Sequence, residues 1–160
     1  MEQNKKRVHR AWAMYDWANS VYNLVITTTF FPVYYNAVSG VKNYPDGVEL
    51  FGYKFVNTAL KDYVLGFAFL IIAFISPILS SIADYRGNKK KFMQFFCAMG
   101  SIACCGMFFF NKDNIGYGLL CFMLAAIGFW SSLVFYNSYL PEIATEEERD
   151  KLSAKGFSYG

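Results

Sequence analysis

Four long apolar segments alternate with short charged ones along the chain. The apolar segments cover residues 11–38, 63–83, 92–110 and 115–140, and each has at least 19 residues. A helix of this length, rising about 1.5 Å per residue, can cross about 30 Å of hydrocarbon. The pattern predicts an all-α membrane protein with four transmembrane helices. Apolar residues return near position 155 and predict the start of a fifth helix.

The first apolar segment also carries polar side chains at helical spacing. Four of them recur at intervals of four, three and four residues, namely Asp16, Ser20, Asn23 and Thr27. This spacing places them on one face of a helix, with Asn19 beside them. A polar group facing lipid costs several kcal/mol, so we expect the stripe to face protein or water. Two interpretations stay open: hydrogen bonds that hold a helix bundle together, or the wall of a solute pathway.

Two other apolar segments have polar ends. Serines recur at intervals of four residues near the end of segment 63–83, and segment 115–140 ends in Tyr136 and Asn137. This unequal distribution of polar side chains favours a central cavity over a uniform membrane anchor. The candidate pathway residues are Asp16, Asn19, Ser20, Asn23, Thr27, Tyr136 and Asn137.

The distribution of charge predicts the orientation of the chain. Eleven of the fifteen Lys and Arg residues lie in the N-terminal tail, in the loop between the second and third segments, or after the fourth. Basic residues gather on the cytoplasmic side of membrane proteins, which predicts a cytoplasmic N-terminus. With 55% apolar and 20% aromatic residues, the composition is typical of a multi-pass membrane protein. We expect contact with the lipid bilayer and none with nucleic acid, which would need a basic face on a folded domain.

The sequence offers few groups for catalysis. The one histidine, His9, lies in the basic tail, where we expect it to be solvated, and the four cysteines lie in apolar stretches without a CxxC pair. The sequence has no clustered metal ligands, no Ser-His-Asp candidate and no Gly-rich loop that would bind a nucleotide. We therefore expect no enzyme activity, no metal and no cofactor.

The most specific motif is the short loop SSIADYRGNKKKFM, which begins at Ser80. An Asp ends one span, a Gly three residues later permits a tight reversal, and lysines precede the next span. The loop resembles the signature loop between spans two and three of major facilitator transporters, roughly G-x-L-A-D-R-x-G-R-K. Ser80 replaces the first Gly of that pattern, and Arg86 lies one place beyond the usual Arg. The resemblance implies a cytoplasmic gate formed by the residues Asp84, Arg86, Gly87 and Lys89.

Two further stretches are similar to one branch of that superfamily, the vacuole-effluxer (autophagy-related 22-like) branch. They are WAMYDWANSVYNLVITTTFFPVYY from Trp12 and FYNSYLPEIATEEERDKLSAKGFSYG from Phe135. The resemblance implies that residues 1–160 are part of the N-terminal six-helix half of a major facilitator fold. It also implies a secondary transporter, in a bacterial inner membrane, that exports a small solute such as amino acids.

The chain stops where a fifth span would begin, so we expect an incomplete chain that lacks the C-terminal half of the transporter. Alternating access needs two halves that move about a site near the middle of the membrane, so these residues alone are not expected to transport. The alternative is a self-contained four-span membrane protein. It would act as an oligomer or an assembly subunit without transport of its own.

Overall fold

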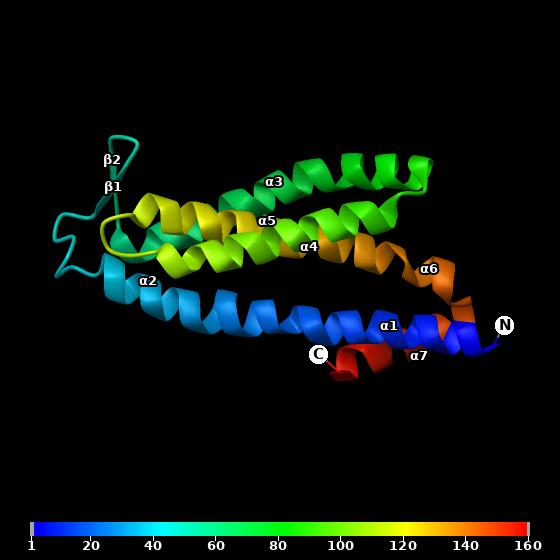
Figure 1. Ribbon diagram of the computed structural model, residues 1–160. Helices are drawn as coiled ribbons and strands as arrows, with labels where there is room; N and C mark the ends of the chain where they lie inside the picture. Colours follow the sequence, from blue (N-terminus) through cyan, green and yellow to red (C-terminus); the bar gives the residue numbers. More distant parts are fainter. Residues whose placement is uncertain (1, 160) are drawn as a thin grey trace.

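The computed structural model describes residues 2–159, apart from the side chains of Glu2, Asp84 and Arg86. It shows a bundle of helices with one small β-hairpin (Figure 1). The chain begins with a continuous helical run, made of α1 (Glu2–Val21), the π-helix η1 (Tyr22–Phe30) and α2 (Phe31–Ser39). This run covers the predicted segment 11–38 and extends it into the basic tail, whose Gln, Lys and Arg residues are good helix formers.

A π-helix interrupts the α-helical pattern of the first run. Pro32 lies just beyond it, and its ring would collide with the carbonyl four residues earlier in a regular α-helix. The residues before Pro32 are rich in β-branched side chains, which lower helix propensity. The hydroxyls of Thr28 and Thr29 both donate to the Leu24 carbonyl, at 2.7 and 2.8 Å. These bonds give that carbonyl partners where the usual ladder of backbone hydrogen bonds has shifted.

A two-stranded hairpin closes one end of the bundle, here called the hairpin end. It pairs β1 (Val48–Leu50) with β2 (Tyr53–Phe55) in antiparallel register, and Val48 lies opposite Phe55. Val48 is fully buried against the helices. The Tyr44 hydroxyl donates to the Lys112 carbonyl, which ties the loop before the hairpin to the loop between α4 and α5.

Five more helical elements and one short turn complete the fold. They are α3 (Asn57–Arg86), α4 (Lys89–Gly106), the 3-10 turn η2 (Met107–Phe109), α5 (Ile115–Ser138), α6 (Leu140–Ile143) and α7 (Glu146–Tyr159). Three stretches are long and apolar enough to cross a membrane, namely Asn57–Ala83, Lys89–Phe109 and Ile115–Ile143. The prediction of an all-α fold is confirmed, and three of the four predicted spans coincide with these candidate membrane-spanning helices. Segment 11–38 is helical throughout, but among the described residues it is not one of these three.

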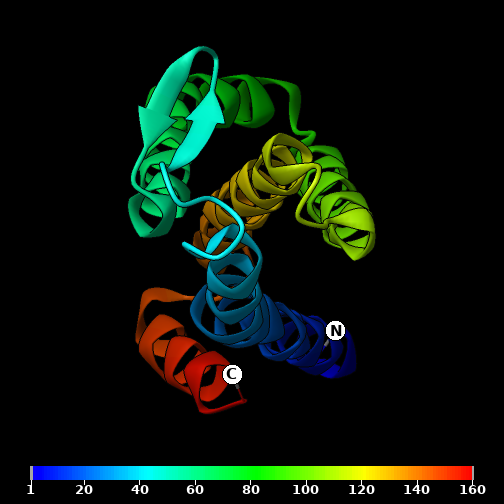
Figure 2. The same ribbon diagram turned by 90° about the vertical axis from the view of Figure 1, so that its left-hand side faces the viewer.

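Helix α5 lies at the centre of the bundle. Along its apolar stretch 61% of the residues are buried, compared with 11% for α4 and 6% for α3. Figure 2, which looks along the helices, shows α3 and α4 on one side of α5 and the first helical run on the other. Helix α7 packs beside α1. The three helices are similarly apolar, but they differ in how much of their surface is buried, because only α5 is surrounded by other helices.

Two glycines bring α4 and α5 into backbone contact. A Cβ atom added at Gly128 would lie 2.6 Å from the Gly100 amide nitrogen and 2.7 Å from the Phe96 carbonyl oxygen. Small residues at a helix interface allow such close approach, which gains van der Waals contact in a membrane where lipid is as apolar as Leu. The α4–α5 pair is thus the most tightly packed part of the bundle.

Candidate functional site

A cavity of about 360 Å³ lies between the first helical run, α4 and α5. Asn19 and Tyr22 line it from the first run, and Ser132 lines it from α5. The wall formed by α4 carries the small side chains Cys97, Gly100, Ser101 and Cys104. These small side chains recur at intervals of three or four residues, so they lie on one face of α4, and this spacing is the signal in the sequence that could have indicated a cavity here. The predicted pathway list contains none of these α4 and α5 residues.

Asn19 is the one predicted pathway residue that lines this cavity. Its Nδ2 group is buried and has no hydrogen-bond partner in the described part of the chain. The hydroxyls of Tyr22 and Thr27 lie near one another but form no hydrogen bond of good geometry. Unpaired buried polar groups are destabilising, by about 1–3 kcal/mol each, so they are normally satisfied by a ligand or by water.

The rest of the predicted stripe is spread over different surroundings. Asp16 is half-buried and forms no ion pair or hydrogen bond with any described side chain. The Ser20 hydroxyl donates to the Trp17 carbonyl at 2.8 Å, within its own helix, and Asn23 is exposed. The spacing argument assumed an α-helix, but the π-helix begins at Tyr22, so Asn23 and Thr27 do not continue the face of Asp16 and Ser20.

Tyr136 belongs to a buried aromatic cluster rather than to the wall of the 360 Å³ cavity. Its ring stacks on Trp12 and Tyr15, with ring centres 4.3 and 5.0 Å apart. The Trp12 Nε1 group donates to the Tyr136 carbonyl at 3.2 Å. The Tyr15 hydroxyl donates to Ser132 Oγ at 3.0 Å and also contacts Cys97 Sγ at 2.8 Å. These contacts fasten α1 to both α4 and α5.

The other residue predicted at the end of α5, Asn137, is exposed. The helical periodicity that buries Tyr136 directs its neighbour outwards. A role for Asn137 in a pathway stays a prediction.

The reversal between α3 and α4 depends on Gly87. Its φ angle of +61° lies in the left-handed region, which glycine adopts without steric cost. Lys89, in the first turn of α4, forms an ion pair with Glu142 of α6 at 2.6 Å. The side chains of Asp84 and Arg86, two of the predicted gate residues, lie outside the described part of the chain. The loop therefore contacts α6, a partner that the sequence motif does not indicate.

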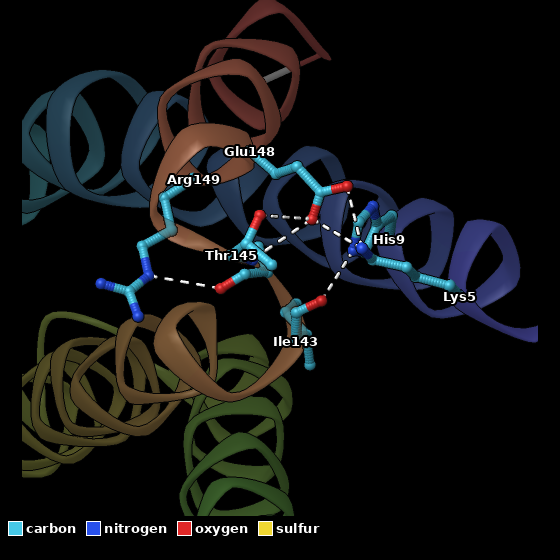
Figure 3. Close-up of polar contacts among 7 residues, drawn as sticks. Lys5, His9, Ile143, Thr145, Glu148 and Arg149 are labelled. Carbon is cyan, nitrogen blue, oxygen red and sulfur yellow. Dashed lines mark hydrogen bonds and ion pairs between the residues drawn. The ribbon is translucent and has the colours of Figure 1, made fainter. Parts of the chain in front are cut away.

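The N-terminal helix is tied to the segment that joins α6 and α7, as Figure 3 shows. Lys5 forms an ion pair with Glu148 at 2.7 Å, and His9 Nε2 lies 2.8 Å from the Ile143 carbonyl oxygen. Lys5, His9 and Trp12 recur at helical spacing, so one face of α1 makes all these contacts. The expectation that His9 is solvated is wrong, because the Ile143 carbonyl and the adjoining corner partly bury its ring.

Glu148 also caps the start of α7. Its Oε2 atom accepts hydrogen bonds from the Thr145 hydroxyl at 3.0 Å and the Thr145 amide at 3.2 Å. A Thr followed three residues later by a Glu is the sequence pattern of a helix-capping box. The stretch TEEE, from Thr145 to Glu148, therefore indicates the start of α7 in the sequence. The α7 helix then places Gly156 against Trp12, where an added Cβ atom would lie 2.9 Å from the indole ring.

The Lys5–Glu148 contact predicts an acid-sensitive attachment of α7 to α1. The Lys5 ammonium and the Thr145 amide and hydroxyl lower the pKa of Glu148 from its usual 4.5 to about 2. A lowered pKa stabilises the folded state above pH 4.5, and this contribution is lost as the pH falls towards 2. We expect the distance between spin labels on α1 and α7 to increase over this range.

Glu148→Gln should remove this transition, and Glu147→Gln, a matched change at an exposed position of the same helix turn, should keep it. An unchanged transition in Glu148→Gln would contradict the assignment.

Residues 4–157 match the protein family described as "Vacuole effluxer Atg22 like". The chain belongs to this family. The predicted resemblance to vacuole effluxers is thereby confirmed. No solved structure matches the chain at a significant level.

Three curated relatives are similar to most of the chain. The "Uncharacterized MFS-type transporter YxiO" of Bacillus subtilis (strain 168) is 35% identical over 150 residues, which are 94% of this chain and 33% of that protein. An uncharacterized protein of Aquifex aeolicus is 26% identical over 155 residues, which are 34% of its length. Autophagy-related protein 22 of Chaetomium globosum is 28% identical over 151 residues, which cover 81% of this chain and 23% of that protein's length. The chain thus spans about a third or less of these curated relatives.

Proposed function

We propose that these residues form the N-terminal part of a secondary transporter of major facilitator type, which exports a small solute such as an amino acid. The family match over residues 4–157 carries this proposal. The relative from Bacillus subtilis is named an MFS-type transporter, and all three relatives are about three to four times as long as this chain. Alternating access needs two halves, so the proposal assigns the remainder of the relatives' length to the rest of the transporter.

The proposed topology has four spans, with the first formed by segment 11–38, and places the N-terminus in the cytoplasm of a bacterium. Three basic segments support it: the N-terminal tail, the α3–α4 loop and the chain after α6 lie at one end of the bundle, here called the α6 end (Figure 1). Basic residues at one end of a bundle are typical of the cytoplasmic side. In this arrangement Asp84, Arg86, Gly87 and Lys89 gate the cytoplasmic entrance.

The solute pathway includes Asn19 in this proposal. Its side chain lines the 360 Å³ cavity, and its amide Nδ2 group has no partner among the described residues. An amide can donate to a carboxylate or carbonyl oxygen, which are groups that amino acids carry. Tyr22 also lines the cavity, and the other lining side chains are apolar or small, which suits a solute of modest size.

Asn19→Leu is expected to reduce solute export in the full-length protein by at least about ten-fold, because a lost hydrogen bond to a charged group costs about 1.5–3 kcal/mol. Export of radiolabelled amino acids from proteoliposomes would be measured. Asn36→Ala, at an exposed position of α2, serves as the control. Equal export by Asn19→Leu and the control would remove Asn19 from the pathway. Failure of the wild-type protein to move any amino acid would overturn the proposed solute class.

A further inference from the structure

A second cavity, of about 300 Å³, is lined by residues close to the α6 end of the bundle. It lies between α1, the first turns of α4 and the junction of α5 with α6. Val8, Ala11 and Trp12 form one wall, Met93 forms the opposite wall, and Tyr139 lies at the junction. The exposed lining is almost wholly apolar. We call this cavity the α1–α4 groove.

Two aromatic residues of the α1–α4 groove, Trp12 and Tyr15, use their polar atoms in bonds to other helices. The Trp12 Nε1 group donates to the Tyr136 carbonyl, and the Tyr15 hydroxyl bonds to Ser132 and Cys97. The remaining ring surfaces of Trp12 and Tyr15 offer no hydrogen bonds, so water gains little by lying against them. A chain of methylene groups suits such a surface.

One rim of the groove is cationic. Lys90 lines the groove, and its side chain has no ion pair within the described residues, because Glu142 is bound to Lys89. Lys90 also lies in the first turn of α4, an 18-residue helix whose N-cap residue, Asn88, makes no side-chain cap. Its N-terminal amides and helix dipole favour an anion at this position. On the α1 side the exposed Arg7 precedes Ala11 by one helical turn.

We propose that the α1–α4 groove binds an anionic phospholipid, with one acyl chain against Trp12 and Met93 and the phosphate beside Lys90. The apolar walls and the cationic rim occur together at the end of the bundle that is rich in basic residues, and charge complementarity selects an anionic headgroup over a zwitterionic one. The inference goes beyond the transported solute and does not depend on it.

Native mass spectrometry of the full-length protein, incubated with phosphatidylglycerol or phosphatidylcholine, tests this proposal. The wild-type protein should retain phosphatidylglycerol preferentially. Lys90→Gln should reduce that retention about five-fold, since one basic residue near a membrane surface contributes about 1 kcal/mol. Lys112→Gln, a matched change in the loop between α4 and α5, should have no effect.

A second pair of variants tests the acyl chain. Met93→Trp and Ala11→Leu narrow the groove from opposite walls and should each abolish retention, whereas Met14→Trp, on an exposed part of α1, should not. Melting curves would confirm that each variant is folded.

Three results would overturn the proposal. The first is equal retention of both lipids. The second is unchanged retention when the groove is narrowed, as expected if another part of the full-length chain fills it. The third is displacement of the lipid by inorganic phosphate, which would leave a headgroup site without an acyl chain.

Discussion

Gly128→Ala is expected to push α5 away from α4 and to lower the stability of the bundle by about 1–3 kcal/mol. The added methyl group would meet the Gly100 amide nitrogen at 2.6 Å and the Phe96 carbonyl oxygen at 2.7 Å. Both are backbone atoms, so no side-chain rotation relieves the collision, and the two helices must separate. Because α5 is the most buried helix, the separation also loosens its other contacts.

A thiol-reactive dye can follow this loss of stability during heating in detergent, because Cys121 on α5 is buried. Gly66→Ala on α3 is the matched control: its added methyl group meets nothing within 4 Å, and Ala is the better helix former. A Gly128→Ala protein that melts together with this control would show that α4 and α5 are not in backbone contact.

Trp12→Ala is expected to cost about 3 kcal/mol and to release α7 from α1. Trp12 is 8% exposed, stacks on Tyr136 at 4.3 Å and donates to the Tyr136 carbonyl. It also contacts Gly156 of α7, so one side chain joins α1, α5 and α7. Its removal leaves a cavity at the centre of that junction and takes one of two donors from the Tyr136 carbonyl, the other being the Tyr139 amide.

Hydrogen exchange of the α7 amides would detect this release, with faster exchange expected in Trp12→Ala. Trp17→Ala removes the same side chain from the same helix at a position that is 53% exposed, and should leave α7 protected. If both variants exchange alike, Trp12 does not hold the junction together.

Three of the four apolar segments predict the candidate spans of the structure, because helix length and apolar composition are local properties. They do not predict the helix ends: α3 begins at Asn57 rather than near residue 63, since polar residues outside the hydrocarbon also form helix. The π-helix was not predicted. Pro32 and the β-branched residues before it indicate that an α-helix is weak there, but they do not specify which backbone hydrogen-bond pattern replaces it.

The candidate site was predicted in part. The role of Gly87 could be predicted because a tight reversal needs the left-handed region. Asn19 could be singled out because an amide within an apolar segment is expected to face protein or water, and its amide is indeed buried. Lys5 and Glu148, which are 143 residues apart in the sequence, could not be paired from local patterns. The burial of Tyr136 depends in the same way on Trp12, which lies 124 residues before it.

These long separations in sequence have a consequence for the order of events during synthesis. At about 5–20 residues per second, the ribosome adds Tyr136 about 6–25 s after Trp12. During that interval the first helical run has none of its α5 contacts, whereas α3, which buries few residues against other helices, can already enter the lipid. The first helix to be synthesised is therefore among the last to complete its packing. The contacts of α1 with α5 can form only after α5 has been synthesised.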